Sequence, residues 1–219
     1  MIRTAIFDLD GTLLDTVDDL GYAVNTALEE FGYPTHPRSA YLYFVGNGAR
    51  NLVRRALPEN AEKSAFEAVY ARYSAIYEER WNVFTRPYEG IPELLDALKR
   101  DGVKLGVLSN KIHARTCEVI ASYFPGVFDA VFGNRPDVPL KPDPAAVFET
   151  LAALGGDAAG AFYLGDTAVD IETGRNAGVY TAGALWGFRP EEIRRVGADV
   201  ICATPADALA AARKFFADR

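Results

Sequence analysis

The 219-residue chain is long enough to bury one large core, or a core with a smaller companion domain. Its formal net charge of −7 argues against nucleic acid or an anionic membrane surface as a partner. Cys117 and Cys202 are the only cysteines and have no metal-ligand spacing, so the sequence indicates neither a disulfide framework nor a zinc site. The N-terminus lacks a signal-peptide apolar segment and no apolar stretch reaches membrane-spanning length, so we expect a cytoplasmic protein.

Short apolar runs bounded by turn residues predict strands along most of the chain. They cover residues 4–10, 103–109, 129–133, 161–166, 179–185 and 198–203. Helix-period segments separate most of these runs. One covers 143–155, with Asp143 as N-cap, Pro144 as the first helical residue and Gly155 just past the end. This alternation predicts an α/β fold, a Rossmann-like doubly wound parallel sheet covered on both faces.

The stretch from 16 to 87 interrupts that rhythm with helical patterns only. Residues 16–32 carry an apolar face that Thr16 opens and Gly32 closes, and residues 47–57 and 61–81 also have helical periodicity. We therefore predict a catalytic core of residues 1–15 and 88–219 and an inserted all-helical cap domain of residues 16–87.

Two carboxylates, Asp8 and Asp10, directly follow the first predicted strand. Like charges about 4 Å apart repel by roughly 4 kcal/mol at an effective dielectric near 20, so a cation, a shared proton or a chemical task must compensate them. Gly11 and Thr12 come next and suit a tight turn whose amides can approach an anion.

Further polar groups follow other predicted strands or precede a helix. They are Ser109 and Asn110, Lys141, and Asp166 with Asp170. Because functional groups of open parallel sheets collect beyond the carboxyl ends of the strands, we expect these groups to share one edge of the sheet. A calcium loop starting at Asp8 is excluded, since its required glycine and glutamate positions hold Leu13 and Asp19.

Four motifs in this sequence, "FDLDGT", "VLSN", "LKPDP" and "GDTAVD", resemble those of the haloacid dehalogenase superfamily in order and spacing. The position and helicity of the insert resemble members with an α-helical cap. The stretches "DGTLLDTVDDLGYAVNTALEEFG" and "FVGNGARNLVRRAL" resemble phosphoglycolate phosphatases. The resemblance therefore implies a phosphatase.

The resemblance also implies a role for each motif residue. Asp8 would be the nucleophile that forms an aspartyl phosphate, and Asp10 the general acid and base. Mg²⁺ would be the cofactor, and a hard cation would offset the carboxylate repulsion. Its ligands would be Asp8, the Asp10 backbone carbonyl and Asp166, with Asp170 in support. The groups implied around the phosphate are Lys141, Ser109, Asn110, Gly11 and Thr12.

Other branches and other classes of protein fit the sequence less well. The dehalogenases lack the second carboxylate that Asp10 supplies. A phosphonoacetaldehyde hydrolase needs a cap lysine, and the only one is Lys63, in a polar segment. Mutases typically carry a histidine where Leu20 stands, so a phosphomutase is less favoured. A signalling receiver would lack the helical insert, and a catalytically idle interaction protein would be expected to have lost one of the motif side chains, all of which are present.

The expected partner is a small phosphorylated metabolite, and the cap would select it. Gly48 and Arg50 of "GNGARNLVRR" suit a small anionic leaving group such as glycolate. The alternatives are a phosphatase of broad specificity for sugar phosphates or nucleotides, and a pyrophosphatase. Whether Arg54 and Arg55 face the site, and whether the protein is a monomer or a homodimer, stays open at this point.

Overall fold

The computed structural model describes residues 2–219, which divide into two compact units. The core unit comprises the residues up to Leu14 together with Pro87–Arg219, and the helical unit is Asp15–Arg86. Where the chain passes between them, β2 (Leu14–Asp15) and β3 (Arg86–Pro87) pair as a two-stranded sheet. None of the helices described in residues 2–219 is long and apolar enough to cross a membrane.

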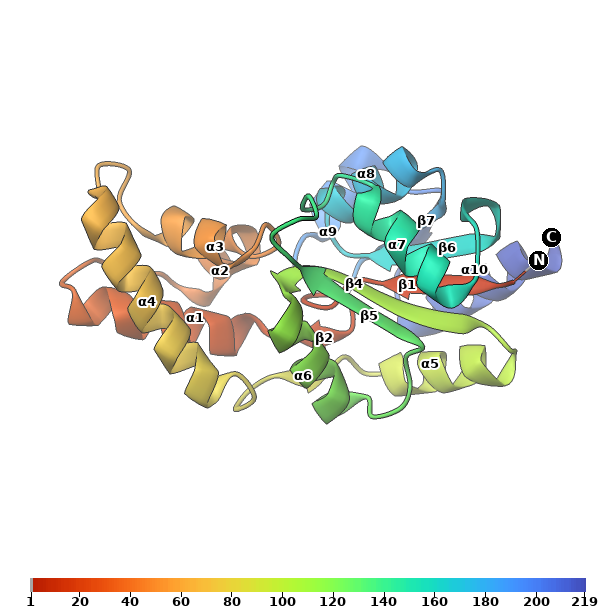
Figure 1. Cartoon of the computed structure of the whole chain (residues 1–219), viewed down its shortest axis with the longest axis horizontal. Coiled ribbons are helices and arrows are strands. Elements are labelled where there is room, and N and C mark those ends of the chain that lie inside the picture. Colours follow the sequence, from red (N-terminus) through yellow and green to blue (C-terminus); the bar gives the residue numbers. More distant parts are fainter. Residues whose placement is uncertain (1) are drawn as a thin grey trace. The chain divides into compact units, whose positions relative to one another are not determined.

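The core unit is built on a six-stranded parallel sheet in the order β5-β4-β1-β6-β7-β8 (Figure 1). The strands are β1 (Thr4–Phe7), β4 (Lys104–Ile112), β5 (Ala130–Asn134), β6 (Ala161–Gly165), β7 (Tyr180–Ala184) and β8 (Val200–Cys202). The predicted α/β class is confirmed. Because β1 pairs with β4 on one side and β6 on the other, the strand order reverses at β1, where α/β sheets place their ligand sites.

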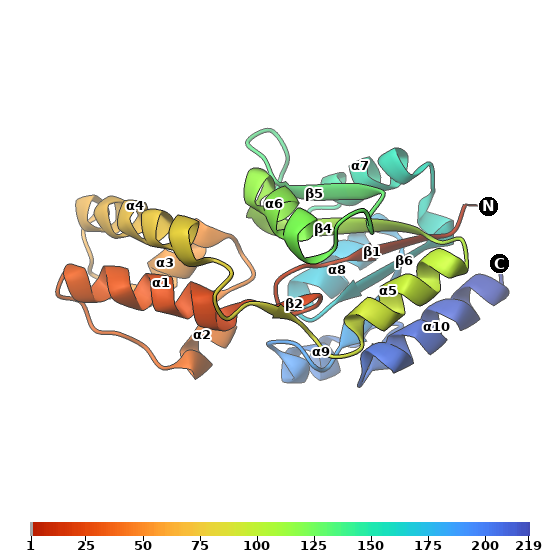
Figure 2. The ribbon, with the colours of Figure 1, turned by 90° about the horizontal axis from the view of Figure 1, so that it is seen from below.

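Helices cover both faces of this sheet, with α5 beside α10 and α7 beside α8 (Figures 1 and 2). The helices of the core unit are α5 (Ile91–Arg100), α6 (His113–Tyr123), α7 (Ala145–Leu154), the short 3-10 helix η1 (Ala158–Gly160), α8 (Ala168–Ala177), α9 (Pro190–Val196) and α10 (Pro205–Ala217). One buried cluster packs Val147 and Leu151 of α7 against Ile6 and Tyr163 of the sheet. Burial of the strands on both faces explains their nearly continuous apolar sequences.

Several predicted boundaries differ from the structure; β1, for example, ends at Phe7 and not at residue 10. Helix α7 begins at Ala145 with Pro144 as its N-cap, while the Asp143 carboxylate accepts a hydrogen bond from the Ala145 N–H at 2.9 Å. Asp143 thus lies one position before the N-cap residue, yet its carboxylate still accepts from the first N–H of the helix. Gly155 ends the helix in a left-handed conformation (φ 71°), as expected. Strand β4 extends past the predicted residue 109 to Ile112.

The helical unit contains α1 (Val17–Glu30), α2 (Arg38–Phe44), α3 (Ala49–Ala56) and α4 (Lys63–Arg80). Helices α1 and α4 lie side by side (Figure 2). The sequence analysis missed α2, which is too short to show a clear period. Tertiary contacts stabilise it: the buried Tyr41 packs on Gly21 of α1, and its hydroxyl donates to Asn25 Oδ1 at 2.6 Å.

Asp19 ties the start of α1 to the end of the helical unit. Its buried carboxylate accepts hydrogen bonds from the Thr85 N–H and Thr85 hydroxyl, both at 2.7 Å, and from the Phe84 N–H at 3.0 Å. One buried carboxylate thus gathers donors from two consecutive residues at the end of the unit, while the Thr85 hydroxyl also contacts the Trp81 carbonyl at 3.0 Å.

We predict that Asp19→Ala destabilises the protein by about 3 kcal/mol, because it removes the buried charged acceptor that the Thr85 and Phe84 N–H groups share. The matched control is Asp18→Ala. Asp18 is the neighbouring residue, and its exposed ion pair with Arg38 is worth at most about 1 kcal/mol. Urea unfolding of both variants measures the difference, and equal losses would contradict the role of Asp19.

Candidate active site

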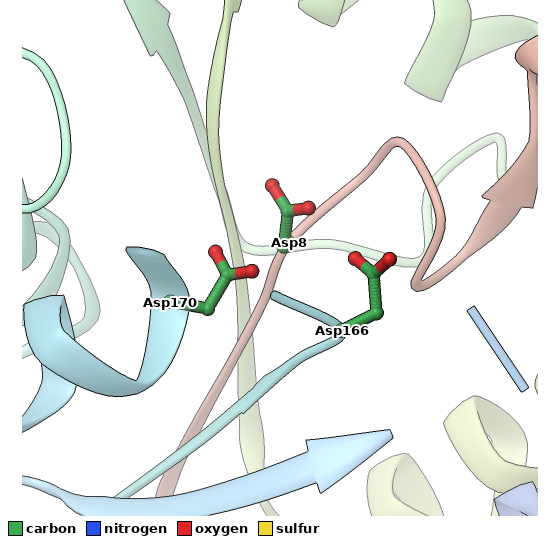
Figure 3. Close-up of side chains that lie close together, drawn as sticks. All are labelled: Asp8, Asp166 and Asp170. Carbon is green, nitrogen blue, oxygen red and sulfur yellow. The ribbon is translucent and has the colours of Figure 1, made fainter. Parts of the chain in front are cut away.

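Three buried carboxylates meet at the carboxyl edge of the sheet. Asp8 follows β1, Asp166 follows β6, and Asp170 lies in the first turn of α8. One carboxylate oxygen from each lies within 4.8 Å of the others. Figure 3 shows the three side chains pointing in the same direction from their separate elements. Parallel pairing of β1 with β6 accounts for this, because it aligns the ends of the two strands.

Lys141 is the cation of this cluster. Its Nζ donates to Asp8 Oδ1 at 2.7 Å, to Asp170 Oδ1 at 2.6 Å and to the Leu108 carbonyl at 3.2 Å. These contacts use all three ammonium hydrogens. Although burial lowers the pKa of Lys141, the Asp170 and Asp8 carboxylates outweigh it and raise that pKa well above its usual value. Lys141 is therefore charged.

One lysine does not balance three carboxylates. Burial raises the pKa of Asp8 from 3.8 to about 7; the Lys141 ammonium opposes this shift and the Asp170 carboxylate adds to it. Burial, together with the charges of Asp170 and Asp8, raises the pKa of Asp166 well above its usual value. Carboxylate oxygens are the donors that hard divalent cations prefer, so the cluster is suited to hold one.

Hydrogen bonds fix Asp166 and Asp170 in place. Asp166 accepts from the Thr12 hydroxyl at 3.0 Å and from the Phe188 N–H at 2.8 Å. Asp170 Oδ2 accepts from the Thr167 N–H at 3.1 Å and the Thr167 hydroxyl at 2.7 Å, in a capping box at the start of α8. Its other oxygen, Oδ1, accepts from Lys141 Nζ at 2.6 Å and from the Tyr163 hydroxyl at 3.4 Å.

The turn after β1 leaves no room for a side chain at Gly11. A Cβ there would collide with Asp166 Oδ2, and the φ of +94° is one that other residues rarely adopt. The Gly11 N–H donates to the Leu14 carbonyl at 2.8 Å, and the Thr12 N–H to the Leu9 carbonyl at 3.4 Å. In this structure both residues therefore shape the turn.

Two neighbours at the end of β4 have different contacts. Asn110 holds the backbone of Lys141, because its Oδ1 accepts from the Lys141 N–H at 3.0 Å and its Nδ2 donates to the Lys141 carbonyl at 3.4 Å. The Ser109 hydroxyl accepts from the Lys111 N–H at 3.2 Å. The structure thus brings Ser109 and Asn110 to the same edge of the sheet as the carboxylates.

The sequence analysis missed Lys111 and Trp186. Lys111 Nζ lies 2.8 Å from each oxygen of Asp10. The only local signal for Lys111 is that it directly follows "VLSN" in the sequence. Trp186, in the loop after β7, donates from Nε1 to the Thr12 carbonyl at 3.0 Å, and no local pattern indicates that contact.

The predicted substrate residues of the insert lie in the helical unit. Gly48 caps α3 with φ 84°, and Arg50 pairs with Glu67 at 2.5 Å. The Arg50 guanidinium also lies 4.8 Å from the ring centroids of Phe66 and Tyr70. These contacts fall within the helical unit, so the role of Arg50 and Gly48 in substrate binding stays a prediction.

Arg54 and Arg55 also make contacts inside the helical unit. Arg54 stacks on the Phe66 ring at 4.4 Å from its centroid. Arg55 donates to the Tyr43 and Phe44 carbonyls, each at 3.0 Å, and to Asn47 at 2.8 Å. Arg55 therefore fixes the segment that leads into α3.

The raised pKa of Asp8 predicts how the metal-free protein responds to pH. Between pH 3.8 and 7 the Asp8 carboxyl binds more protons in the folded protein, where its pKa is about 7, than in the unfolded chain, where it is near 3.8. The protonated Asp8 carboxyl therefore contributes its full stabilisation below pH 3.8, and this stabilisation is lost as the pH rises towards 7. With EDTA, the unfolding free energy should fall by up to about 4 kcal/mol across this window. Asp8→Asn should flatten that dependence, and an unchanged slope in this variant would contradict the assignment. Urea titrations at a series of pH values measure it.

Comparisons with known proteins agree with this arrangement. The sequence matches the model of the haloacid dehalogenase-like hydrolase family over residues 5–184. It is 36% identical over 188 residues to a phosphoglycolate phosphatase of Aquifex aeolicus (strain VF5), covering 85% of this chain and 86% of the relative. It is also 32% identical over 212 residues to an N-acetylmuramic acid 6-phosphate phosphatase of Pseudomonas aeruginosa, covering 95% of this chain and 93% of the relative.

The fold comparison gives the same family. The crystal structure of a candidate phosphoglycolate phosphatase from Lactobacillus delbrueckii subsp. bulgaricus superposes with a TM-score of 0.90 at 30% identity, covering 96% of this chain and 98% of that one. The family match spans most of the chain, including the carboxylate cluster and its lysine. The chain therefore belongs to the haloacid dehalogenase-like hydrolases and is a phosphatase of that family.

Proposed function

We propose that this phosphatase hydrolyses a small phosphate monoester through an aspartyl phosphate on Asp8, with Mg²⁺ as cofactor. The observation that carries the proposal is the buried Asp8, which lies between a lysine and two further carboxylates at the switch point of the sheet. A nucleophilic carboxylate is an established route to a phosphoenzyme.

Mg²⁺ fits the residues at this edge of the sheet. The donors are all oxygens, and burial and mutual repulsion raise the pKa of both Asp8 and Asp166. Asp8, Asp166 and the backbone carbonyl of Asp10 would hold the ion, while Asp170 supports the site through Lys141. When bound, the ion would offset the charge on the phosphoryl oxygens.

The chain's own groups would then carry the reaction in two steps. In the first, Asp8 attacks phosphorus, a bond from Asp8 oxygen to phosphorus forms, and the bond to the leaving oxygen breaks. Asp10, as a carboxylic acid, gives its proton to that oxygen. In the second, water attacks phosphorus, Asp10 takes the water proton, and the bond to Asp8 breaks to release phosphate. Lys141 and Ser109 stabilise the transferring charge.

Asp8→Asn should abolish turnover while retaining the fold, because an amide cannot form the acyl phosphate. Asp166→Asn should weaken Mg²⁺ binding, since the site loses a charged ligand. Mg²⁺ should raise the melting temperature of the wild type. At a concentration of a hundred times its Kd it would add about 2.7 kcal/mol to the free energy of unfolding.

Phosphate release, mass spectrometry of the trapped phosphoenzyme and melting curves test these outcomes together. Undiminished hydrolysis by Asp8→Asn would refute the nucleophile assignment. Hydrolysis that survives removal of divalent ions would refute the metal requirement.

For the substrate we propose phosphoglycolate, with a broader range of sugar phosphates or nucleotides as the alternative. Support comes from the relatives named as phosphoglycolate phosphatases. The relative named for N-acetylmuramic acid 6-phosphate keeps the alternative open, although that compound also carries a carboxylate. In this proposal Arg50 of the helical unit selects the leaving group. Its guanidinium would release its exposed partner Glu67 and bind the substrate carboxylate instead.

Arg50→Ala should lower kcat/KM for phosphoglycolate about 10- to 100-fold more than for p-nitrophenyl phosphate, which has no carboxylate. Arg54→Ala is the matched control, because Arg54 stacks on the same Phe66 ring. Equal losses of Arg50→Ala on both substrates would show that Arg50 supports the helical unit or binds the phosphate instead. Steady-state rates on both esters and on N-acetylmuramic acid 6-phosphate decide between the two substrate classes.

A further inference from the structure

A second lysine, Lys111, forms an ion pair with Asp10, the carboxylate that is not part of the Asp8, Asp166 and Asp170 cluster. Lys111 Nζ lies 2.8 Å from both Oδ1 and Oδ2 of Asp10, and only 8% of the lysine side chain and 12% of the aspartate side chain are exposed. These residues are 101 positions apart in sequence, and the pairing of β1 with β4 brings them together. Such shielding makes this pair less sensitive to salt than a surface ion pair.

The backbone of Lys111 is fixed independently of this ion pair. Its N–H donates to Ser109 Oγ at 3.2 Å, and its carbonyl accepts from the Thr116 hydroxyl at 3.1 Å. The same carbonyl packs so closely on Gly133 that a Cβ there would collide with it. The lysine therefore projects from a rigid strand end, as a residue that positions another group must.

Lys141 and Lys111 form ion pairs with different acidic groups of the site. Lys141 contacts Asp8 and Asp170, whereas Lys111 contacts Asp10. Among the described residues, the group of converging carboxylates contains Asp8, Asp166 and Asp170 but not Asp10. A cation at that group would attract a fourth nearby carboxylate. A carboxylate captured as a ligand could no longer exchange a proton with the substrate.

We propose that Lys111 is a positioning residue that holds the Asp10 carboxylate apart from the cluster and available for proton transfer. This inference rests on the proposed function, in which Asp10 protonates the leaving oxygen. Lys111 occupies one lone pair on each oxygen of Asp10, which leaves the remaining lone pairs for the transferred proton.

The test compares esters that differ in their need for an acid. An alkyl phosphate such as phosphoglycolate or glycerol phosphate has a poor leaving group and requires protonation, whereas p-nitrophenyl phosphate expels a stable anion without it. In the two-step reaction kcat/KM reports the steps up to departure of the leaving group. Lys111→Met should therefore lower kcat/KM by about 10- to 100-fold for the alkyl esters and by less than about threefold for the aryl ester.

Three variants make the comparison specific. Lys104→Met removes the other lysine of β4 that forms an ion pair, an exposed one with Asp129 at 2.8 Å, and should change neither value. Lys111→Arg should restore most of the alkyl-ester activity, because it keeps a charged donor. In an Asp10→Asn background Lys111→Met should have little further effect, since the group it positions has lost its proton.

Calorimetry adds a readout that does not depend on turnover. If Lys111 holds Asp10 off the cluster, Lys111→Met should bind Mg²⁺ at least as tightly as the wild type. A tenfold weaker affinity would show that Lys111 supports the metal ligands, and would overturn the proposal. Lys111→Gln replaces Lys111→Met throughout if circular dichroism shows that the methionine variant does not fold.

Equal losses on alkyl and aryl esters, or no loss on either, would also overturn the positioning role. Failure of the underlying function has a different signature. In that case the wild type would form no phosphoenzyme and Asp8→Asn would retain its activity, whatever Lys111→Met does.

Discussion

The buried contact of Lys141 with Asp8 and Asp170 is the interaction around which the core site is arranged. Burying charges is tolerated only when they are paired and hydrogen-bonded, and here each ammonium hydrogen has an acceptor. The pairing is incomplete, because Asp166 adds a further carboxylate without a cation of its own. The excess of carboxylates makes this edge of the sheet suited to hold a cation.

The scaffold makes such crowding possible. Neighbouring parallel strands end together, so residues far apart in sequence converge without long loops. The turn after β1 has to pass beside the Asp166 carboxylate, and Gly11 lets it do so without a side chain in the way. The Thr12 hydroxyl then holds that same carboxylate. Packing and polar positioning at this edge are therefore parts of one arrangement.

The helical unit has its own polar framework. Asp19 joins the first and last segments of that unit, and Arg55 fixes the segment before α3. Arg50 differs, because its partner Glu67 is exposed and an exposed ion pair is weak. The Arg50 guanidinium also lies over the Phe66 and Tyr70 rings, so aromatic contacts as well as the ion pair hold it.

The sequence by itself determined the α/β class and the position of every strand in the parallel sheet, because buried strands leave continuous apolar runs and the turns between them carry glycine and proline. It also placed Asp8 and Asp166 at the carboxyl ends of apolar strands, while the family resemblance added Lys141 and Asp170 to the expected site. The helix α2 was not predicted, because its stability comes from Tyr41 packing on Gly21 and not from a local pattern.

Only the tertiary structure decided how the polar groups pair. Sequence spacing could not tell that Asn110 holds the Lys141 backbone or that the Phe188 N–H reaches Asp166. Nor could it pair Lys141 with Asp8, and it gave no indication that Lys111 pairs with Asp10. Strand order and side-chain direction set these contacts, and both arise from packing across the whole sheet, whereas the apolar periodicity that reveals a strand is a property of the local chain.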